Sequence, residues 1–444
     1  MRRTNIVGWG YALLAIFVIS APFEGYTALP GMAGHSIFSL IARPVVLILP
    51  FVIAWQFLTG PRPLWGLLVV LGAWLSVVAA TYWWVSPHTY YDAYYLWSQA
   101  GGVALVGALW ILAHKRTVFV PTVSLGLFLY TVATIVVGLW EVKTGHHLGP
   151  ARTNGHIPTT FYFDPNSLGA AIALTVPYIA LLWMGKPRRT ITALSLLALV
   201  PLLYLLYKTG SRGGYLALWL SVMTAPWILP VPYRRAAWWT LASLTGLGIA
   251  VVVWLHNLPH NVPLPFALQK LKHLSDIFTR LHVTQAHSKP TSLSIRVALL
   301  RAGWQAVQHH PWGLGPRGAE RWFAHQTTYN TYGVIDAHNM WLENAIDFGW
   351  LGVTLLVLWY GWILTRAFRL SRNGSTPWIR YVGAASAASL TGFIVGSVSP
   401  SSVMVGFHLM WVVFGTVVGA VVIDQQRPQR YPFKKSSVLP TPHT

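Results

Sequence analysis

The stretch Asp336-Ala-His-Asn-Met-Trp-Leu-Glu-Asn-Ala-Ile-Asp-Phe-Gly-Trp-Leu-Gly352 stands where a polar segment passes into an apolar run that ends near Leu364. Asp336 is a typical helix N-cap, so we expect a helix to begin here with His338 and Asn339 in its first turn. The positive end of the helix dipole favours a neutral imidazole at His338, and a neutral imidazole can accept a proton. Alternatively, His338 is an interfacial histidine that only caps its helix.

The composition is that of an integral membrane protein. Hydrophobic residues make up 54% of the chain and charged residues 9%, with a mean hydropathy of +0.51. Twenty-four tryptophans and nineteen tyrosines suit side chains that lie at the level of the lipid headgroups. The chain has no cysteine, so it has no disulfide bond and no thiol chemistry.

For the whole chain we expect an all-α membrane protein with about twelve transmembrane helices, at roughly 20 apolar residues per crossing. Spans one to nine occupy residues 1–255, a large and partly helical loop occupies 256–337, a helix start and spans ten to twelve occupy 338–423, and a basic tail occupies 424–444. The expected spans are Asn5–Phe23, Ile37–Leu58, Leu64–Val85, Leu96–Leu112, Val118–Val142, Ser167–Met184, Thr190–Tyr207, Gly213–Leu229, Ala236–Leu255, Leu351–Thr365, Trp378–Val398 and Val403–Ile423. Within the loop, apolar residues at helical spacing predict helices at Leu264–Arg280 and Ser294–His309.

The distribution of lysine and arginine predicts the orientation of these helices. Both termini and the even-numbered connections are basic, whereas the short odd-numbered connections around Gly25, Tyr90 and Pro400 carry no cation. This positive-inside pattern places both termini in the cytoplasm, and it explains the net charge of +21 without nucleic-acid binding. Three outer connections break the pattern by carrying cations: Lys143–Asp164, Lys208–Arg212 and His256–Ala337.

Among these cations, Arg212 and Arg296 are the main candidates for binding an anion. Arg212 lies in the glycine-rich turn Thr209-Gly-Ser-Arg-Gly-Gly214, and an arginine at the membrane edge is costly unless it meets an anion or snorkels to a lipid phosphate. Arg296 shares a helical face with Leu300 and could bind phosphate oxygens through two parallel hydrogen bonds, or else lie on a solvated face.

Other polar residues are weaker candidates for a role in such a site. Asp164 or Asn166 is expected to cap a helix, and Arg152 is a third possible cation for the same anion. Glu343 and Asp347, four residues apart, form a possible carboxylate pair, although we expect them to orient neighbouring arginine or histidine side chains. With only ten acidic residues and no ligand-like spacing, we expect no catalytic metal.

An outer cavity with several arginines, one neutral histidine and no metal suggests transfer of a sugar from a lipid-linked diphosphate. The arginines would stabilise the departing diphosphate, and His338 would take the proton of the attacking hydroxyl. From a different class, a transporter or flippase would bind the same lipid-linked anion without reacting with it.

His338-Asn339, followed by nine residues and Gly349-x-x-Gly352, resembles the H[N/S/Q]-x9-G-x-x-G pattern of bacterial O-antigen ligases. Arg296-x-x-x-Leu300 is similar to that family's R-x-x-x-L loop motif, and Ser211-Arg212-Gly213 is similar to its Ser-Arg-Gly turn. Weaker landmarks are Pro311-Trp-Gly-Leu-Gly315 and Asp164-Pro-Asn166. The motifs extend from about Arg152 to Gly352, and the topology agrees throughout the chain.

The resemblance implies a membrane glycosyltransferase of the GT-C type in the bacterial inner membrane, with its active site in the periplasm. It would move polysaccharide from undecaprenyl diphosphate to a sugar of lipid A–core by an inverting reaction that needs no metal or other cofactor. The implied residues are His338 as base and Arg212 and Arg296 on the diphosphate, with Asn339, Arg152, Arg301 and Glu343 in support. O-antigen polymerases and protein O-oligosaccharyltransferases of the same superfamily remain alternatives, although the His/Gly spacing favours a ligase.

Overall fold

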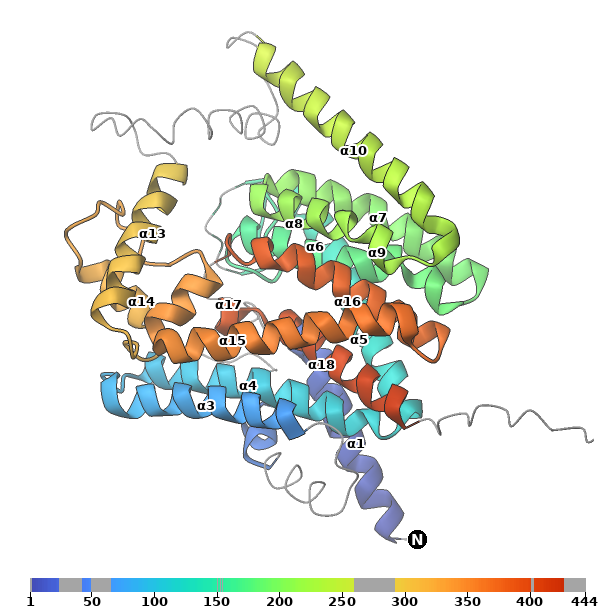
Figure 1. Ribbon diagram of the computed structural model, residues 1–444, viewed down its shortest axis with the longest axis horizontal. Helices are drawn as coiled ribbons and strands as arrows, with labels where there is room; N and C mark the ends of the chain where they lie inside the picture. Colours follow the sequence, from blue (N-terminus) through green and yellow to red (C-terminus); the bar gives the residue numbers. More distant parts are fainter. Residues whose placement is uncertain are drawn as a thin grey trace, which may run out of the picture.

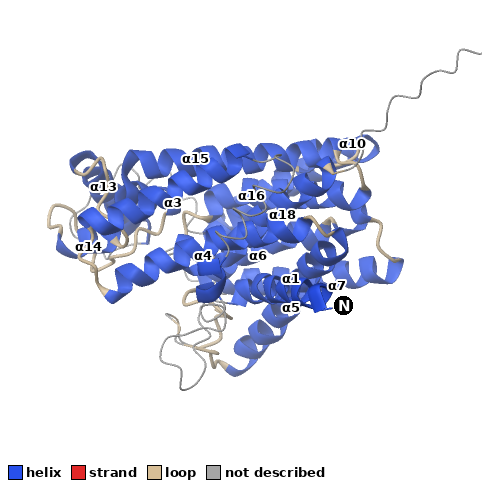
Figure 2. Ribbon diagram, turned by 90° about the horizontal axis from the view of Figure 1, so that it is seen from below, coloured by secondary structure: helices blue, strands red, loops and turns tan. Residues whose placement is uncertain are grey.

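The computed structural model describes residues 2–23, 42–48, 65–149, 151, 153, 155–258, 292–400 and 403–426, and within these ranges every regular element is a helix (Figures 1 and 2). The helices are α1 (Arg2–Ser20), η1 (Ala21–Phe23), α3 (Trp65–Val85), α4 (Tyr90–Ala113), α5 (Arg116–Thr144), α6 (Pro165–Ala180), η2 (Leu182–Gly185), α7 (Arg189–Thr209), α8 (Arg212–Met223), α9 (Ala225–Ile228), α10 (Val231–Asn257), α13 (Ser292–His309), α14 (Gly318–His325), α15 (Met340–Asn373), α16 (Pro377–Gly396), α17 (Val403–Gly406) and α18 (His408–Gln425).

The expectation of a multi-pass membrane protein agrees with this architecture. Among the described residues, seven helices are long and apolar enough to cross a membrane: α4, α5, α7, α10, α15, α16 and α18. Shorter apolar helices cover Trp9–Phe23 and Val69–Val85, where two further spans were expected. The count of twelve spans and the GT-C assignment remain predictions, and most of the expected span Ile37–Leu58 lies outside the described residues.

Four expected spans differ from the helices that the structure contains. The Asn5–Phe23 segment ends its α-helix at Ser20 and continues as the short helix η1. The Ser167–Met184 segment ends its α-helix at Ala180 and continues as the short helix η2. The Gly213–Leu229 segment is divided at Thr224 into α8 and α9, and the Val403–Ile423 segment is divided at Phe407 into α17 and α18. Hydropathy averages over such breaks, so it locates the apolar segment and not the helix ends.

The centre of the bundle is formed by α4, α16 and α18, most of whose residues are buried. Side-chain hydroxyls connect α16 to its neighbours: Ser389 donates to the carbonyl of Leu174 on α6 at 2.6 Å, and Tyr360 of α15 donates to the carbonyl of Leu390. Gly392 lies directly against the backbone of α8 at Ala217, where any side chain would collide. Small residues and interhelical hydrogen bonds are the usual means by which membrane helices pack closely.

The periphery has the opposite character. Most of α7 and α10 is not buried in the protein, although both are strongly apolar. In Figure 1, α10 runs diagonally along one edge of the molecule, away from α15 and α16. Apolar faces without protein contacts suit contact with lipid tails.

The helices α13 and α14, which we call the cap, lie at one end of the bundle in both views (Figures 1 and 2). The cap has a hydrophobic core of its own, which it shares with the first part of α15. This core contains Leu299, Ala302, Ala306, Val307, Ala319, Phe323, Ala337, Leu342, Ala345 and Ile346. The helix expected at Ser294–His309 is confirmed as α13, whereas the one expected at Leu264–Arg280 lies outside the described residues.

Candidate active site

The two glycine-rich motifs of the sequence meet in space where α15 changes direction. Gly349 has φ 65° and ψ −170°, which divides α15 into Met340–Phe348 and a longer second part. The Pro311–Gly315 segment lies against this break: Leu314 N donates to the carbonyl of Ile346 at 2.9 Å, and Trp350 N donates to the carbonyl of Pro311 at 3.0 Å. The backbones approach so closely that a side chain at Gly349 would overlap Pro311. The glycine is required by this crossing as well as by its positive φ.

The start of α15 differs from the expected one. The N-cap is Asn339, whose side chain accepts hydrogen bonds from the N–H groups of Trp341 at 3.1 Å and Leu342 at 3.3 Å. Asp336 is therefore not the cap, and neither His338 nor Asn339 lies in the first helical turn. His338 precedes the cap with φ 47°, a left-handed conformation that is uncommon outside glycine and costs of order 1–3 kcal/mol. Such strain is often found at functional sites, and the positive end of α15 is still beside the residue.

Three elements meet at the segment Ser397–Ser399, directly after α16. Met340 N, at the start of α15, donates to the carbonyl of Ser397 at 3.1 Å. Arg296 of α13 donates from Nη2 to Ser399 Oγ at 3.2 Å. Gly213, the residue after Arg212, lies so close that a Cβ there would be 2.6 Å from the Cβ of Ser399. The segment thus brings together the elements that carry His338, Arg296 and Arg212, which are far apart in sequence.

The charges at this junction suit an anion. Burial and the nearby positive charge of Arg212 lower the pKa of Arg296, while the negative charge of Asp164 partly offsets this effect. Among the described residues, neither Arg212 nor Arg296 forms an ion pair with a carboxylate. Two neighbouring guanidinium groups that are partly removed from water repel each other, and Asp164 is not within ion-pair distance of either, so a bound anion would stabilise both.

A second charged cluster lies between α4, α14 and α15. Tyr95 Oη is 3.2 Å from Glu343 Oε1 and 3.1 Å from Glu320 Oε1, and Asp347 Oδ1 accepts a hydrogen bond from Ala319 N at 2.7 Å. Arg317 pairs with Glu320. Glu343 therefore contacts a tyrosine and Asp347 contacts the first turn of α14, and the positive charge of Arg321 is close enough to act on Asp347.

The other predicted residues have different outcomes. Arg301 has an exposed side chain on α13, and Arg152 lies outside the described residues. Asp164 is confirmed as the N-cap of α6, accepting hydrogen bonds from Asn166 N and Ser167 N. Among the described residues, no group of three or more histidine, aspartate or glutamate side chains is arranged to hold a metal ion. The expectation of a metal-independent reaction remains a prediction.

Sequence reasoning missed the residues that join these elements. In the sequence, Ser397 is the last residue but one of the expected span Trp378–Val398, Ser399 belongs to a short connection, and Tyr95 is one of many interfacial aromatic residues. Glu320 and Arg317 fall in the large loop without a recognisable motif. A seryl carbonyl or hydroxyl that links distant helices has no signature in one sequence, because its partners are far away in the chain: Arg296 is 103 residues from Ser399, and Met340 belongs to a different helix from Ser397.

Two comparisons with known proteins bear on this site. Residues 197–357 match the family model described as O-antigen ligase, a range that runs from α7 to the middle of α15 and includes Arg212, Arg296 and His338. The chain is also 24% identical, over 313 residues, to the teichuronic acid biosynthesis protein TuaE of Bacillus subtilis (strain 168). That alignment covers 67% of this chain and 60% of the relative's length.

Proposed function

We propose, on the premise that this chain belongs to the O-antigen ligase/polymerase superfamily, that it is an O-antigen ligase. It would transfer polysaccharide from undecaprenyl diphosphate to a sugar hydroxyl of lipid A–core, in the bacterial inner membrane and on the periplasmic side. The observation that carries the proposal is the junction at Ser397–Ser399, where Arg296, the residue after Arg212 and the start of α15 meet.

In this proposal the arginines bind the diphosphate of the donor. Arg212 lies at the first position of α8, after the N-cap Ser211, so the N–H groups of that helix end add to its charge. Arg296 approaches from α13 and is oriented by its hydrogen bond to Ser399. As the bond between the anomeric carbon and the diphosphate oxygen breaks, negative charge grows on that oxygen, and both guanidinium groups stabilise it.

His338 is the proposed base. A hydroxyl oxygen of the acceptor attacks the anomeric carbon from the face opposite the diphosphate and forms the new glycosidic bond with inversion. The hydroxyl proton passes to the neutral imidazole, and the lipid diphosphate leaves with the electron pair of the broken bond. His338 lies directly before the N-cap of α15, where the positive end of a helix dipole disfavours a second positive charge, and the neutral imidazole is the form that can accept this proton.

The proposed orientation rests on where the cations lie. The second half of α15 ends in Arg366, Arg369 and Arg372, far along the helix from the cap end. In a positive-inside arrangement this basic end faces the cytoplasm, together with both termini, and the cap faces the periplasm. The lipid-linked donor would then reach the junction laterally from the bilayer.

The direct test is transfer by the purified protein in lipid nanodiscs, with a defined undecaprenyl-diphosphate glycan and a defined lipid A–core acceptor. We expect transfer that persists in the presence of a chelator and is abolished by His338→Ala, while donor binding is retained. A His338→Ala protein that transfers glycan as the wild type does would refute the assigned base. In proteoliposomes, which have two separate sides, a wild type that moves the donor across the membrane and never transfers glycan would identify a transporter instead.

A second candidate keeps the chemistry and changes the acceptor. This alternative is a polymerase of the same superfamily, and it is compatible with the relative from Bacillus subtilis, which is named for the biosynthesis of teichuronic acid and not for lipopolysaccharide. The lipopolysaccharide of a deletion strain separates the two. Loss of a ligase leaves bare core and lipid-linked polymer, whereas loss of a polymerase leaves core with a single repeat unit. If the lipopolysaccharide of the deletion strain is the same as that of the wild type, the remaining alternative is a serine or threonine of a protein as the acceptor.

A further inference from the structure

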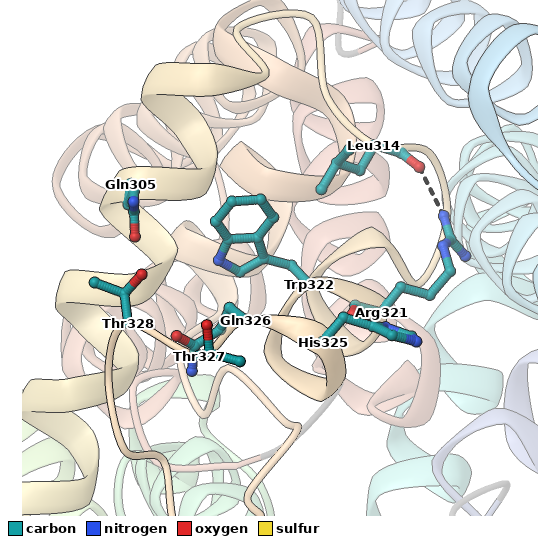
Figure 3. A pocket seen from close by; sticks show the side chains of 8 residues that line it. All are labelled: Gln305, Leu314, Arg321, Trp322, His325, Gln326, Thr327 and Thr328. Carbon is teal, nitrogen blue, oxygen red and sulfur yellow. Dashed lines mark hydrogen bonds between the residues drawn. The ribbon is translucent and has the colours of Figure 1, made fainter.

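The cap contains a cavity that the proposed reaction does not use. It has a volume of about 410 Å³ and is lined by Gln305, Leu314, Arg321, Trp322, His325, Gln326, Thr327 and Thr328 (Figure 3). The lining residues come from α13, from α14 and from the loops on either side of α14. Cavities of this size, with a few polar groups among apolar side chains, are typical of small-molecule sites.

Trp322 provides an aromatic wall that is held in place from behind. Its indole N–H donates to the carbonyl of Ala302 at 2.9 Å, and the ring of His310 meets it edge-on at 5.7 Å. In the view of Figure 3 the indole lies amid the other lining side chains, with Leu314 on one side and Gln305 on the other. A flat apolar surface fixed in this way can receive the C–H face of a pyranose ring.

The polar groups of the cavity are suited to hydroxyl groups. Gln305 Oε1 is buried and has no hydrogen-bond partner in the described part of the chain. Gln326 uses its amide to close a turn with Tyr329, which leaves the hydroxyls of Thr327 and Thr328 exposed. A buried acceptor without a partner costs stability, and a ligand hydroxyl would satisfy it.

His325 adds an acceptor of defined orientation. Its Nδ1 is 2.8 Å from the carbonyl of Arg321, and since a carbonyl only accepts, Nδ1 must carry the hydrogen in the neutral ring. The exposed Nε2 is then an acceptor for a hydroxyl of the ligand.

The cavity offers no available positive charge, which distinguishes it from the Arg212–Arg296 junction. Arg321 lines the cavity, but its guanidinium pairs with Asp92 at 2.8 Å and also donates to the carbonyls of Leu314 and Pro316. With these donors used and the charge balanced, the cavity favours a neutral ligand over a phosphate.

We propose that this cavity is a carbohydrate subsite for a neutral sugar residue of the glycan substrate, packed on Trp322 and bound through Gln305 and the threonine hydroxyls. The subsite rests on the proposed function, because it assumes a glycan at the junction. Gln305 is nine residues from Arg296 along α13, which at 1.5 Å per residue is roughly 13 Å. A short oligosaccharide can extend over that distance, so one glycan could occupy the junction and the subsite together.

The test is saturation-transfer NMR on the protein in nanodiscs with two probes. One is the free polysaccharide released by mild acid from the lipid-linked polymer, and the other is the core oligosaccharide released from lipid A. We expect one probe to bind the wild type, and its identity assigns the subsite to the donor or to the acceptor. Gln305→Ala should weaken that binding about fivefold to tenfold, the effect of losing one hydrogen bond to a buried group.

The controls separate the subsite from the transfer reaction. Gln308→Ala, an exposed glutamine on the same helix, should bind as the wild type does, and so should His338→Ala. Trp322→Phe keeps an aromatic wall and should retain most of the binding. If transfer is never observed but binding depends on Gln305, the subsite stands and the proposed function fails. If neither probe binds, or if Gln305→Ala binds like the wild type, the subsite is wrong.

Discussion

Replacing Gly349 with alanine tests whether the crossing of α15 and the Pro311–Gly315 segment positions the proposed active site. At φ 65° and ψ −170° the backbone is in a region that only glycine adopts readily, and a residue with a side chain pays of order 1–3 kcal/mol for it. The new methyl group would also overlap Pro311, so the segment must move.

Moving the segment breaks three hydrogen bonds: Leu314 N to Ile346, Gly315 N to Asp347, and Trp350 N to Pro311. At about 1 kcal/mol each, their loss together with the strain lowers the free energy of unfolding by about 4–6 kcal/mol if no relaxation occurs. Partial relaxation reduces this to about 2–4 kcal/mol. Since the helix start that follows His338 belongs to the same short helical piece, we also expect transfer to fall by more than tenfold.

The assay is thermal unfolding of the purified protein in nanodiscs, followed by the transfer reaction. The matched control is Gly361→Ala on the same helix, where a methyl group meets no atom within 4 Å. There, alanine should be neutral or stabilise the exposed helix by up to about 1 kcal/mol. Equal unfolding midpoints and equal activity of Gly349→Ala and Gly361→Ala would refute the argument that this glycine fixes the crossing.

Three further predictions concern charges and a buried carboxylate. Arg296→Ala should lower the turnover of transfer by roughly 10²–10³, as for removal of one donor to a developing oxyanion. The control is Arg369→Ala, which replaces an exposed arginine near the far end of α15 and should change turnover less than twofold. Similar rates for both variants would contradict diphosphate binding by Arg296. Arg296→Lys should recover only part of the loss in a steady-state assay, because lysine cannot form two parallel hydrogen bonds to phosphate. Glu141→Ala removes the acceptor of Thr159 N at 2.7 Å and Thr160 N at 2.8 Å, and should lower the free energy of unfolding by about 2–4 kcal/mol. Glu141→Gln keeps one acceptor oxygen, so its unfolding midpoint should lie between those of Glu141→Ala and the wild type in the same thermal assay. Unchanged midpoints for both variants would show that the carboxylate does not hold the loop before α6.

The amino-acid sequence by itself determined the class of the protein and much of its local structure. Hydropathy located both ends of α5, α7 and α16 closely, whereas α4 and α10 begin at Tyr90 and Val231, more than a helical turn before the expected spans. Helical spacing located α13, and capping preferences limited the cap of α6 to Asp164 or Asn166, of which Asp164 is the cap in the structure. These features depend on neighbours within one or two helical turns, so a single sequence contains the information.

Only the tertiary structure decided how the site is assembled. Asn339 replaces Asp336 as the cap of α15, because the chain also has to place Met340 against Ser397. The break at Gly349 exists because Pro311–Gly315 lies across it, and Glu343 meets Tyr95, which is 248 residues away in the chain. Such contacts follow from packing between distant segments. They leave no periodic pattern in the sequence, which is why neither the joining residues Ser397 and Ser399 nor the arrangement around them could be predicted from it.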